Sequence, residues 1–168
     1  ILGSFFISRY LFKPIGSMQE KLKSLESEKR DNLHALRQDL LRSIILGKNN
    51  LSINDIKPRL EGLNIKFDAE GTYFVILLSI DRYPDYCHTY DPTDMNLYKF
   101  AIMNIATEIF SDSCHTECVD MEDSNIAVCM NPARPDSLPS DDRFRELVLA
   151  VQEAVQKFIH MTVSAFIS

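Results

Sequence analysis

The order of strand and helix patterns after residue 70 restricts the fold of this chain more than any other feature. Residues 72–80 form a near-continuous run of aromatic and branched side chains, which is typical of a central strand buried on both faces. The expected elements are, in order, this strand, a helix capped by Asp94 and ending near Phe110, strands at 117–121 and 125–130 joined by a hairpin, a helix capped by Ser140 and a strand at 162–167.

This order, β-α-β-β-α-β, is the split βαβ arrangement, in which a sheet carries two helices on one face. We therefore expect an α+β fold, with a long N-terminal helix followed by a ferredoxin-like βαββαβ domain whose sheet contains antiparallel strands. Residues 81–92 are polar and include two prolines, so we expect a loop between the first strand and the first helix of the domain.

The N-terminal end is apolar and runs directly into a basic segment. Apolar residues dominate positions 1–12, and Lys13-Pro14 follow them. Because a membrane-spanning helix needs about 20 apolar residues, we interpret residues 1–12 as the cytoplasmic half of a transmembrane helix. An amphipathic or core helix is the alternative, since Ser4, Ser8 and Arg9 dilute the apolar character.

A long helical pattern occupies residues 14–46. Its apolar positions recur at steps of three and four. If Lys29 is counted as a position of the seam, the two consecutive steps of four from residue 25 to 29 to 33 indicate a stutter in a coiled coil. Such a helix would be about 50 Å long at a rise of about 1.5 Å per residue, which is too long for a small domain to cover. The predicted dimerisation seam consists of Met18, Leu22, Leu25, Leu33, Leu36 and Leu40. A surface helix packed on its own domain is the alternative.

Charge is distributed unevenly along the chain. Residues 13–48 carry eight Lys and Arg against five Asp and Glu, whereas residues 49–168 carry nine against nineteen. Basic residues beside a membrane helix mark its cytoplasmic side, so we expect residues 13–168 in the cytoplasm and the protein at the cell membrane. An acidic surface repels phosphate backbones, which argues against direct nucleic-acid binding by residues 49–168.

Four cysteines raise the question of a metal site. Cys87-His88, Cys114-His115 and Cys118 are residue types that ligate zinc. The expected topology sends Cys87 and Cys114 to opposite ends of one sheet, about 30 Å apart along a strand of about nine residues. We therefore expect free thiols and no bound metal.

Four segments of the chain resemble a known family. They are Arg37-x3-Leu41-x4-Leu46-Gly47, the stretch FVILLSIDRY at 74–83, the stretch YKFAIxNIAxE at 98–108, and the closing residues 156–168. With these segments, the chain from about Arg30 onward resembles the central cytoplasmic domain of membrane-anchored AraC-type transcriptional regulators, which is similar to a degenerate GGDEF (diguanylate cyclase) domain. In that family an extracellular sensor, a membrane helix, a linker, this domain and a C-terminal helix-turn-helix pair follow one another.

The resemblance implies that the domain is not an enzyme. A diguanylate cyclase needs carboxylates for Mg²⁺ and a glycine hairpin where phosphates approach the backbone. Ser79 stands at the place of the first metal ligand, and only Asp81 remains of that pair. In the hairpin, Glu122 and Asp123 replace the two glycines and Asn125 replaces a carboxylate. We expect no catalytic residue, no cofactor and no metal.

The acids that stand at these places are a weak candidate for a vestigial site. Asp81, Glu122 and Asp123 would form a pocket for a ligand or metal ion if the fold brought their carboxylates together. The interpretation that we favour is a set of solvated cap and turn residues. The tyrosines of 83–90 are likewise expected to pack the loop rather than to stack on a nucleotide.

These expectations combine into one function. We expect the non-catalytic signal-transmission and dimerisation region of a membrane-bound AraC-type transcriptional regulator. Its predicted parts are the end of a transmembrane helix at 1–12, a coiled-coil linker at 13–48 and a degenerate GGDEF-like domain at 49–168. We expect a homodimer through the linker helix, membrane attachment through residues 1–12, and contact with DNA only through a helix-turn-helix domain beyond Ser168.

Two other functions stay open at this point. One is a degenerate diguanylate cyclase domain that binds nucleotides or cyclic dinucleotides. The other is an input fragment of a sensor kinase. The sequence after Ser168 separates the regulator from the kinase, and binding of GTP or a cyclic dinucleotide identifies the first alternative.

Overall fold

In the computed structural model, the chain separates into two units, Ile1–Ala69 and Glu70–Ser168. The structure describes residues 20–48, 50–132, 134 and 138–167, with side chains from residue 27 onward. The end of a transmembrane helix predicted at 1–12 lies outside these residues. Among the helices that the structure describes, none is long and apolar enough to cross a membrane.

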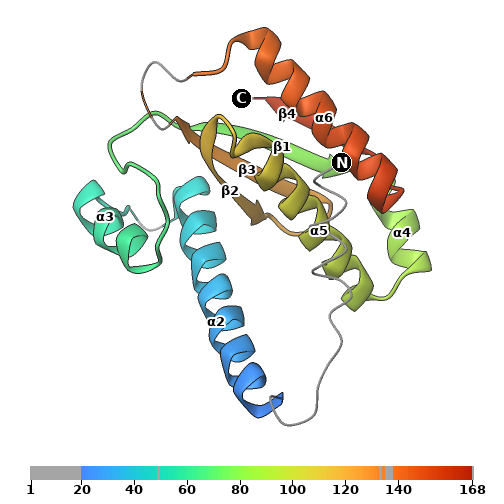
Figure 1. Cartoon of the computed structure of the whole chain (residues 1–168), viewed down its shortest axis with the longest axis horizontal. Coiled ribbons are helices and arrows are strands. Elements are labelled where there is room, and N and C mark those ends of the chain that lie inside the picture. The colour runs from blue at the N-terminus through green and yellow to red at the C-terminus, as the bar shows by residue number, and fades with distance from the viewer. Residues whose placement is uncertain (1–19, 49, 133, 135–137, 168) are drawn as a thin grey trace. The chain divides into compact units, whose positions relative to one another are not determined.

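Two helices make up most of the described part of the first unit (Figure 1). The 26-residue helix α2 (Glu20–Ile45) follows the predicted long helix, and it ends before Gly47, whose φ of +60° is a left-handed conformation that glycine adopts without strain. Helix α3 (Ile53–Gly62) begins after Ser52. The Asp55 carboxylate accepts hydrogen bonds from both the backbone N–H (3.3 Å) and the hydroxyl (2.7 Å) of Ser52, which fixes this start.

The second unit is built on a four-stranded sheet with the order β2-β3-β1-β4. Its strands are β1 (Phe74–Ile80), β2 (Cys114–Asp120), β3 (Asn125–Pro132) and β4 (Val163–Ile167). Each pair of neighbouring strands is antiparallel. The expectation of an α+β fold with antiparallel strands is therefore confirmed.

Two 19-residue helices, α5 (Pro92–Phe110) and α6 (Asp141–Ile159), pack side by side on one face of this sheet (Figure 1). The Ser140 hydroxyl accepts a hydrogen bond from the third helical N–H at 3.3 Å, which confirms Ser140 as the cap of α6. Asp94 was expected to cap α5, but the helix already begins at Pro92. The reason is that Asp91 caps it, by accepting a hydrogen bond from the N–H of Asp94 at 2.9 Å.

The expected loop at 81–92 is wrong in part, because it contains the short helix α4 (Tyr83–Thr89). Pro84 lies in the first turn of α4, where a missing N–H costs no helical hydrogen bond. Arg82 precedes the helix with a left-handed φ of +53°, and its side chain pairs with Asp85 at 2.8 Å. Pro84, which predicts a loop from the sequence alone, lies here in the first turn of a helix.

The strand buried along most of its length is β3, not β1. Residues 126–131 of β3 are all buried, whereas burial alternates along β1. Ile76, Leu78 and Ile80 are at most 3% exposed, and the residues between them are half-buried. The prediction that 72–80 is buried on both faces is therefore wrong, since the apolar run of β1 is fully covered on only one side.

Candidate functional site

A lysine lies on the buried side of α5. Met95, Lys99, Ile102, Ala106 and Phe110 follow one another at steps of three and four, and each is at most 4% exposed. Burying an ammonium group is costly unless it is paired and hydrogen-bonded. The partners of Lys99 therefore identify the most constrained polar cluster of the second unit.

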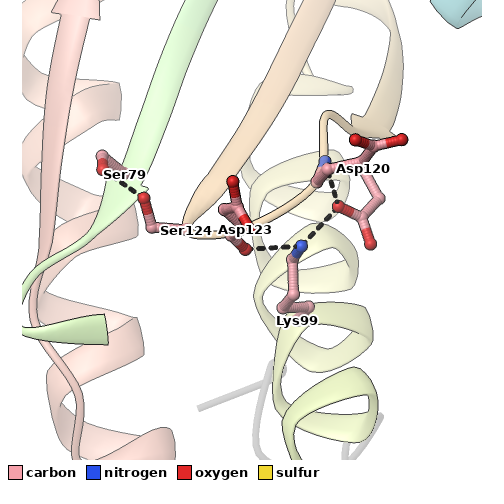
Figure 2. Close-up of polar contacts among 6 residues, drawn as sticks. Ser79, Lys99, Asp120, Asp123 and Ser124 are labelled. Atoms are coloured by element: carbon pink, nitrogen blue, oxygen red, sulfur yellow. Dashed lines mark hydrogen bonds and ion pairs between the residues drawn. The ribbon is translucent and has the colours of Figure 1, made fainter. Parts of the chain in front are cut away.

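The Lys99 ammonium connects the end of β2 to the hairpin that follows it. Figure 2 shows its Nζ donating to the Asp120 carboxylate and to the backbone carbonyl of Asp123, the latter at 2.8 Å. The same oxygen of Asp120 accepts a hydrogen bond from the N–H of Glu122 at 2.9 Å. The ammonium also lies 6.0 Å from the centre of the Tyr83 ring, within the range of a cation–π contact.

The hairpin held by Lys99 has an unusual backbone. Glu122 and Asp123 have φ angles of +74° and +45°, a region that disfavours side chains with a β-carbon, although Asp tolerates it better than Glu does. Two backbone hydrogen bonds close the turn, from the N–H of Asn125 to Glu122 and from the N–H of Met121 to Asn125, both at 3.0 Å. Two consecutive left-handed residues thus occupy the four-residue loop (121–124) between β2 and β3.

The end of β1 is tied to the same hairpin and to β4. The Ser79 and Ser124 hydroxyl oxygens lie 3.1 Å apart (Figure 2), and the N–H of Ile80 donates to the carbonyl of Ser124 at 2.9 Å. The Ser164 hydroxyl of β4 donates to the Asp81 carboxylate at 2.7 Å. Hydroxyls and carboxylates at this edge of the sheet therefore bind one another.

The three acids predicted as a vestigial pocket take different roles. Asp81 is half-buried beside Ser164, whereas Glu122 and Asp123 are exposed and contribute an N–H and a carbonyl to the Lys99 cluster. Throughout the described ranges, no group of three His, Cys, Asp or Glu residues is arranged to hold a metal ion.

The tyrosines after β1 pack against one another and against α5. The rings of Tyr86 and Tyr90 are stacked with centroids 6.4 Å apart, and Tyr90 meets the edge of Tyr98 at 5.1 Å. Burial raises the pKa of Tyr83 to about 12, and a hydrogen bond with Cys87 and the nearby carboxylates of the hairpin add to the rise. The Tyr83 phenol is therefore neutral at physiological pH and unsuited to act as a base.

The four cysteines are free thiols, and three of them are buried. Because β1 and β2 both run antiparallel to β3, Cys87 and Cys114 lie toward opposite ends of the sheet, as expected. Burial raises the pKa of Cys118 and of Cys129 to about 12, which keeps these thiols protonated and poorly nucleophilic.

The predicted dimerisation seam is described only in part. Leu33 and Leu36 are 42% and 56% exposed, whereas Leu40 is 7% exposed. Met18 and the side chains of Leu22 and Leu25 lie outside the described residues. The seam stays a prediction.

Sequence reasoning missed Lys99 as a site residue. The signal was present, because Lys99 continues the apolar series Met95, Ile102, Ala106 at helical spacing. A lone lysine within such a series predicts either a distorted helix face or a buried ion pair. Its partner at Asp120 is not visible in the sequence, since the two residues are 21 positions apart.

Comparison with known proteins adds no assignment. No protein-family model matches the chain, and no curated protein sequence matches it. The function is therefore argued from the residues and the geometry of the second unit.

Replacing Glu122 by glycine is expected to stabilise the protein. Glycine adopts φ > 0 without a steric penalty, so Glu122→Gly is expected to raise the free energy of unfolding by about 1 kcal/mol, and Asp123→Gly by less. Urea denaturation measures both. The control is Glu108→Gly on the exposed surface of α5, which is expected to lower stability by about 1 kcal/mol. Equal destabilisation by all three variants would contradict the strained hairpin.

Removing the Lys99 ammonium is expected to destabilise the second unit. Lys99→Met leaves the Asp120 carboxylate without its cation, and because Asp120 is partly exposed we expect a loss of about 2 kcal/mol. The double variant Lys99→Met/Asp120→Asn is expected to recover part of this loss, since the amide oxygen can still accept the N–H of Glu122. Lys57→Met on the exposed surface of α3 is the control, with an expected change within about 0.5 kcal/mol.

Additive losses in the double variant would show that Lys99 and Asp120 stabilise the fold independently. That result would contradict the cluster described above.

Proposed function

We propose that this chain is the non-catalytic signal-transmission and dimerisation region of a membrane-bound AraC-type transcriptional regulator. In this proposal, residues 1–12 attach it to the cell membrane, residues 13–168 are cytoplasmic, and α2 relays a signal to a DNA-binding domain beyond Ser168. The observation that supports the non-catalytic part is the position of the Lys99 ammonium, which donates hydrogen bonds to the Asp120 carboxylate and to the Asp123 carbonyl. A cyclase would need this edge of the sheet to be open to metal ions and phosphates.

The topology of the second unit supports a ferredoxin-like, GGDEF-like domain. The strand order β2-β3-β1-β4, with α5 and α6 on one face, is the order that a βαββαβ domain of this kind requires. The hairpin gives a second line of support. Glu122 and Asp123, which stand where that family has two glycines, both have the positive φ that glycines favour.

The resemblance to the GGDEF family also argues against catalysis. Ser79 has a hydroxyl in place of a metal-binding carboxylate, and that hydroxyl lies beside Ser124. Asp81 accepts a hydrogen bond from Ser164. A two-metal phosphoryl-transfer site needs several carboxylates facing one open space. Here the Ser79 hydroxyl and the Asp81 carboxylate are instead hydrogen-bonded to Ser124 and Ser164 of the same chain.

Helix α2 supports the transmission part of the proposal. With 26 residues it is about 39 Å long at about 1.5 Å per residue, longer than a single small domain covers. Leu33 and Leu36 present apolar side chains that are 42% and 56% exposed. A second copy of α2 would bury these leucines, and a small shift of two paired helices is a common way to change the spacing of attached domains.

Cysteine cross-linking tests the proposed dimer, and the burial of the native thiols makes the design simple. Only Cys87 is exposed, so Cys87→Ser gives a suitable background without altering the core. In this background, Leu33→Cys and Leu36→Cys are each expected to form disulfide-linked dimers under mild oxidation, because paired seam positions bring Cα atoms within about 7 Å. Non-reducing electrophoresis measures the product.

The matched control is Leu149→Cys on α6, a position with the same 56% exposure as Leu36. It reports random collision and is expected to cross-link far more slowly. Absence of dimers at both seam positions, or equal rates at all three positions, would contradict a dimer through α2.

A further inference from the structure

The first unit has an apolar groove where α2 and α3 meet. The groove has a volume of about 420 Å³, and its apolar lining includes Leu36 and Leu40 from α2 and Leu63, which directly follows α3. Leu36 remains 56% exposed at its edge. Leu40 is only 7% exposed, whereas Leu36 leaves an open apolar surface at the groove.

The two walls of the groove carry opposite charges. Asp39 lines it from α2 and Arg59 lines it from α3, and both residues are exposed. The Asp39 side chain is 75% exposed, and its contact with Arg42 on the same helix is long, at 3.9 Å. An acid on one wall and a base on the other make this surface self-complementary under a two-fold rotation whose axis runs parallel to the groove, because that rotation brings each Asp39 toward the Arg59 of the other copy.

We infer that the occupant of this groove is a second copy of the same surface, so that two copies of α2 and two of α3 form a four-helix contact with reciprocal Asp39–Arg59 pairs. This inference rests on the proposed dimer and extends it. It adds α3 to the interface and assigns a charge pair that fixes the relative position of the two chains. Leu40, which was predicted as a seam residue, then lines the floor of the groove.

Charge reversal tests the pair in the full chain, held in a mild detergent and analysed by sedimentation velocity. Asp39→Arg alone places like charges opposite each other twice per dimer, and so does Arg59→Asp alone. Each is expected to weaken dimerisation about tenfold or more at low salt. The control is Glu61→Arg, an equivalent charge reversal about 200° around α3 from Arg59, which is expected to leave the dissociation constant nearly unchanged.

Mixing the two single variants provides the decisive measurement. A dimer of one D39R chain with one R59D chain restores both opposite-charge contacts, so the mixture is expected to dimerise about as tightly as the unmodified protein. A pair formed within one chain would not be rescued by mixing, because each variant would keep its own repulsion. Circular dichroism of each variant checks that α2 and α3 are still folded.

The outcomes separate this inference from the proposed function. Rescue in the mixture establishes the reciprocal pair. An unmodified protein that dimerises while both single variants dimerise equally well overturns the groove interface but leaves a dimer through α2. Variants that weaken the dimer without rescue on mixing also overturn the reciprocal pair. A monomeric unmodified protein overturns both proposals.

Discussion

The arrangement of the sheet edge depends on one buried ammonium group. Lys99 is 4% exposed, and it is bound to a carboxylate on β2 and to a carbonyl in the following hairpin. The two left-handed residues of that hairpin carry a steric cost, about 1 kcal/mol for Glu122 and less for Asp123. Charge-assisted hydrogen bonds are the strongest class available to offset such a cost, so Lys99 fixes both the turn and the last residue of β2.

This constraint also shapes the functional proposal. A phosphoryl-transfer site has to leave its carboxylates and backbone groups open to metal ions and phosphates. At this edge Lys99 supplies an internal cation, and Ser124 and Ser164 contact the groups at the end of β1. In the proposal, the polar groups at this edge of the sheet therefore have a structural role. The exposed leucines of α2, Leu33 and Leu36, are the better candidates for a functional surface.

The order of the elements, their caps and the α+β class with antiparallel strands were predictable from the sequence, whereas individual long-range side-chain contacts were not. The cap at Ser140 and the hairpin after Asp120 follow from short patterns that need no information about the rest of the chain. Helix α4 was missed because Pro84 reads as a loop signal unless its place in the first turn is known. The vestigial acids were visible in the sequence, but the Lys99–Asp120 pair depends on how α5 packs on β2. The helical spacing of Lys99 within an apolar series indicates that it is buried, but it does not identify its partner.

The chain closes this edge of the sheet with its own lysine, Lys99. The most direct test is ¹⁵N NMR of the Lys99 ammonium in the full chain, with and without GTP and Mg²⁺, assigned by loss of its signal in Lys99→Met. The account predicts one ammonium signal protected from solvent exchange, with a chemical shift that GTP and Mg²⁺ leave unchanged. Rapid exchange with solvent in the free protein, or displacement of the signal by GTP and Mg²⁺, would contradict it.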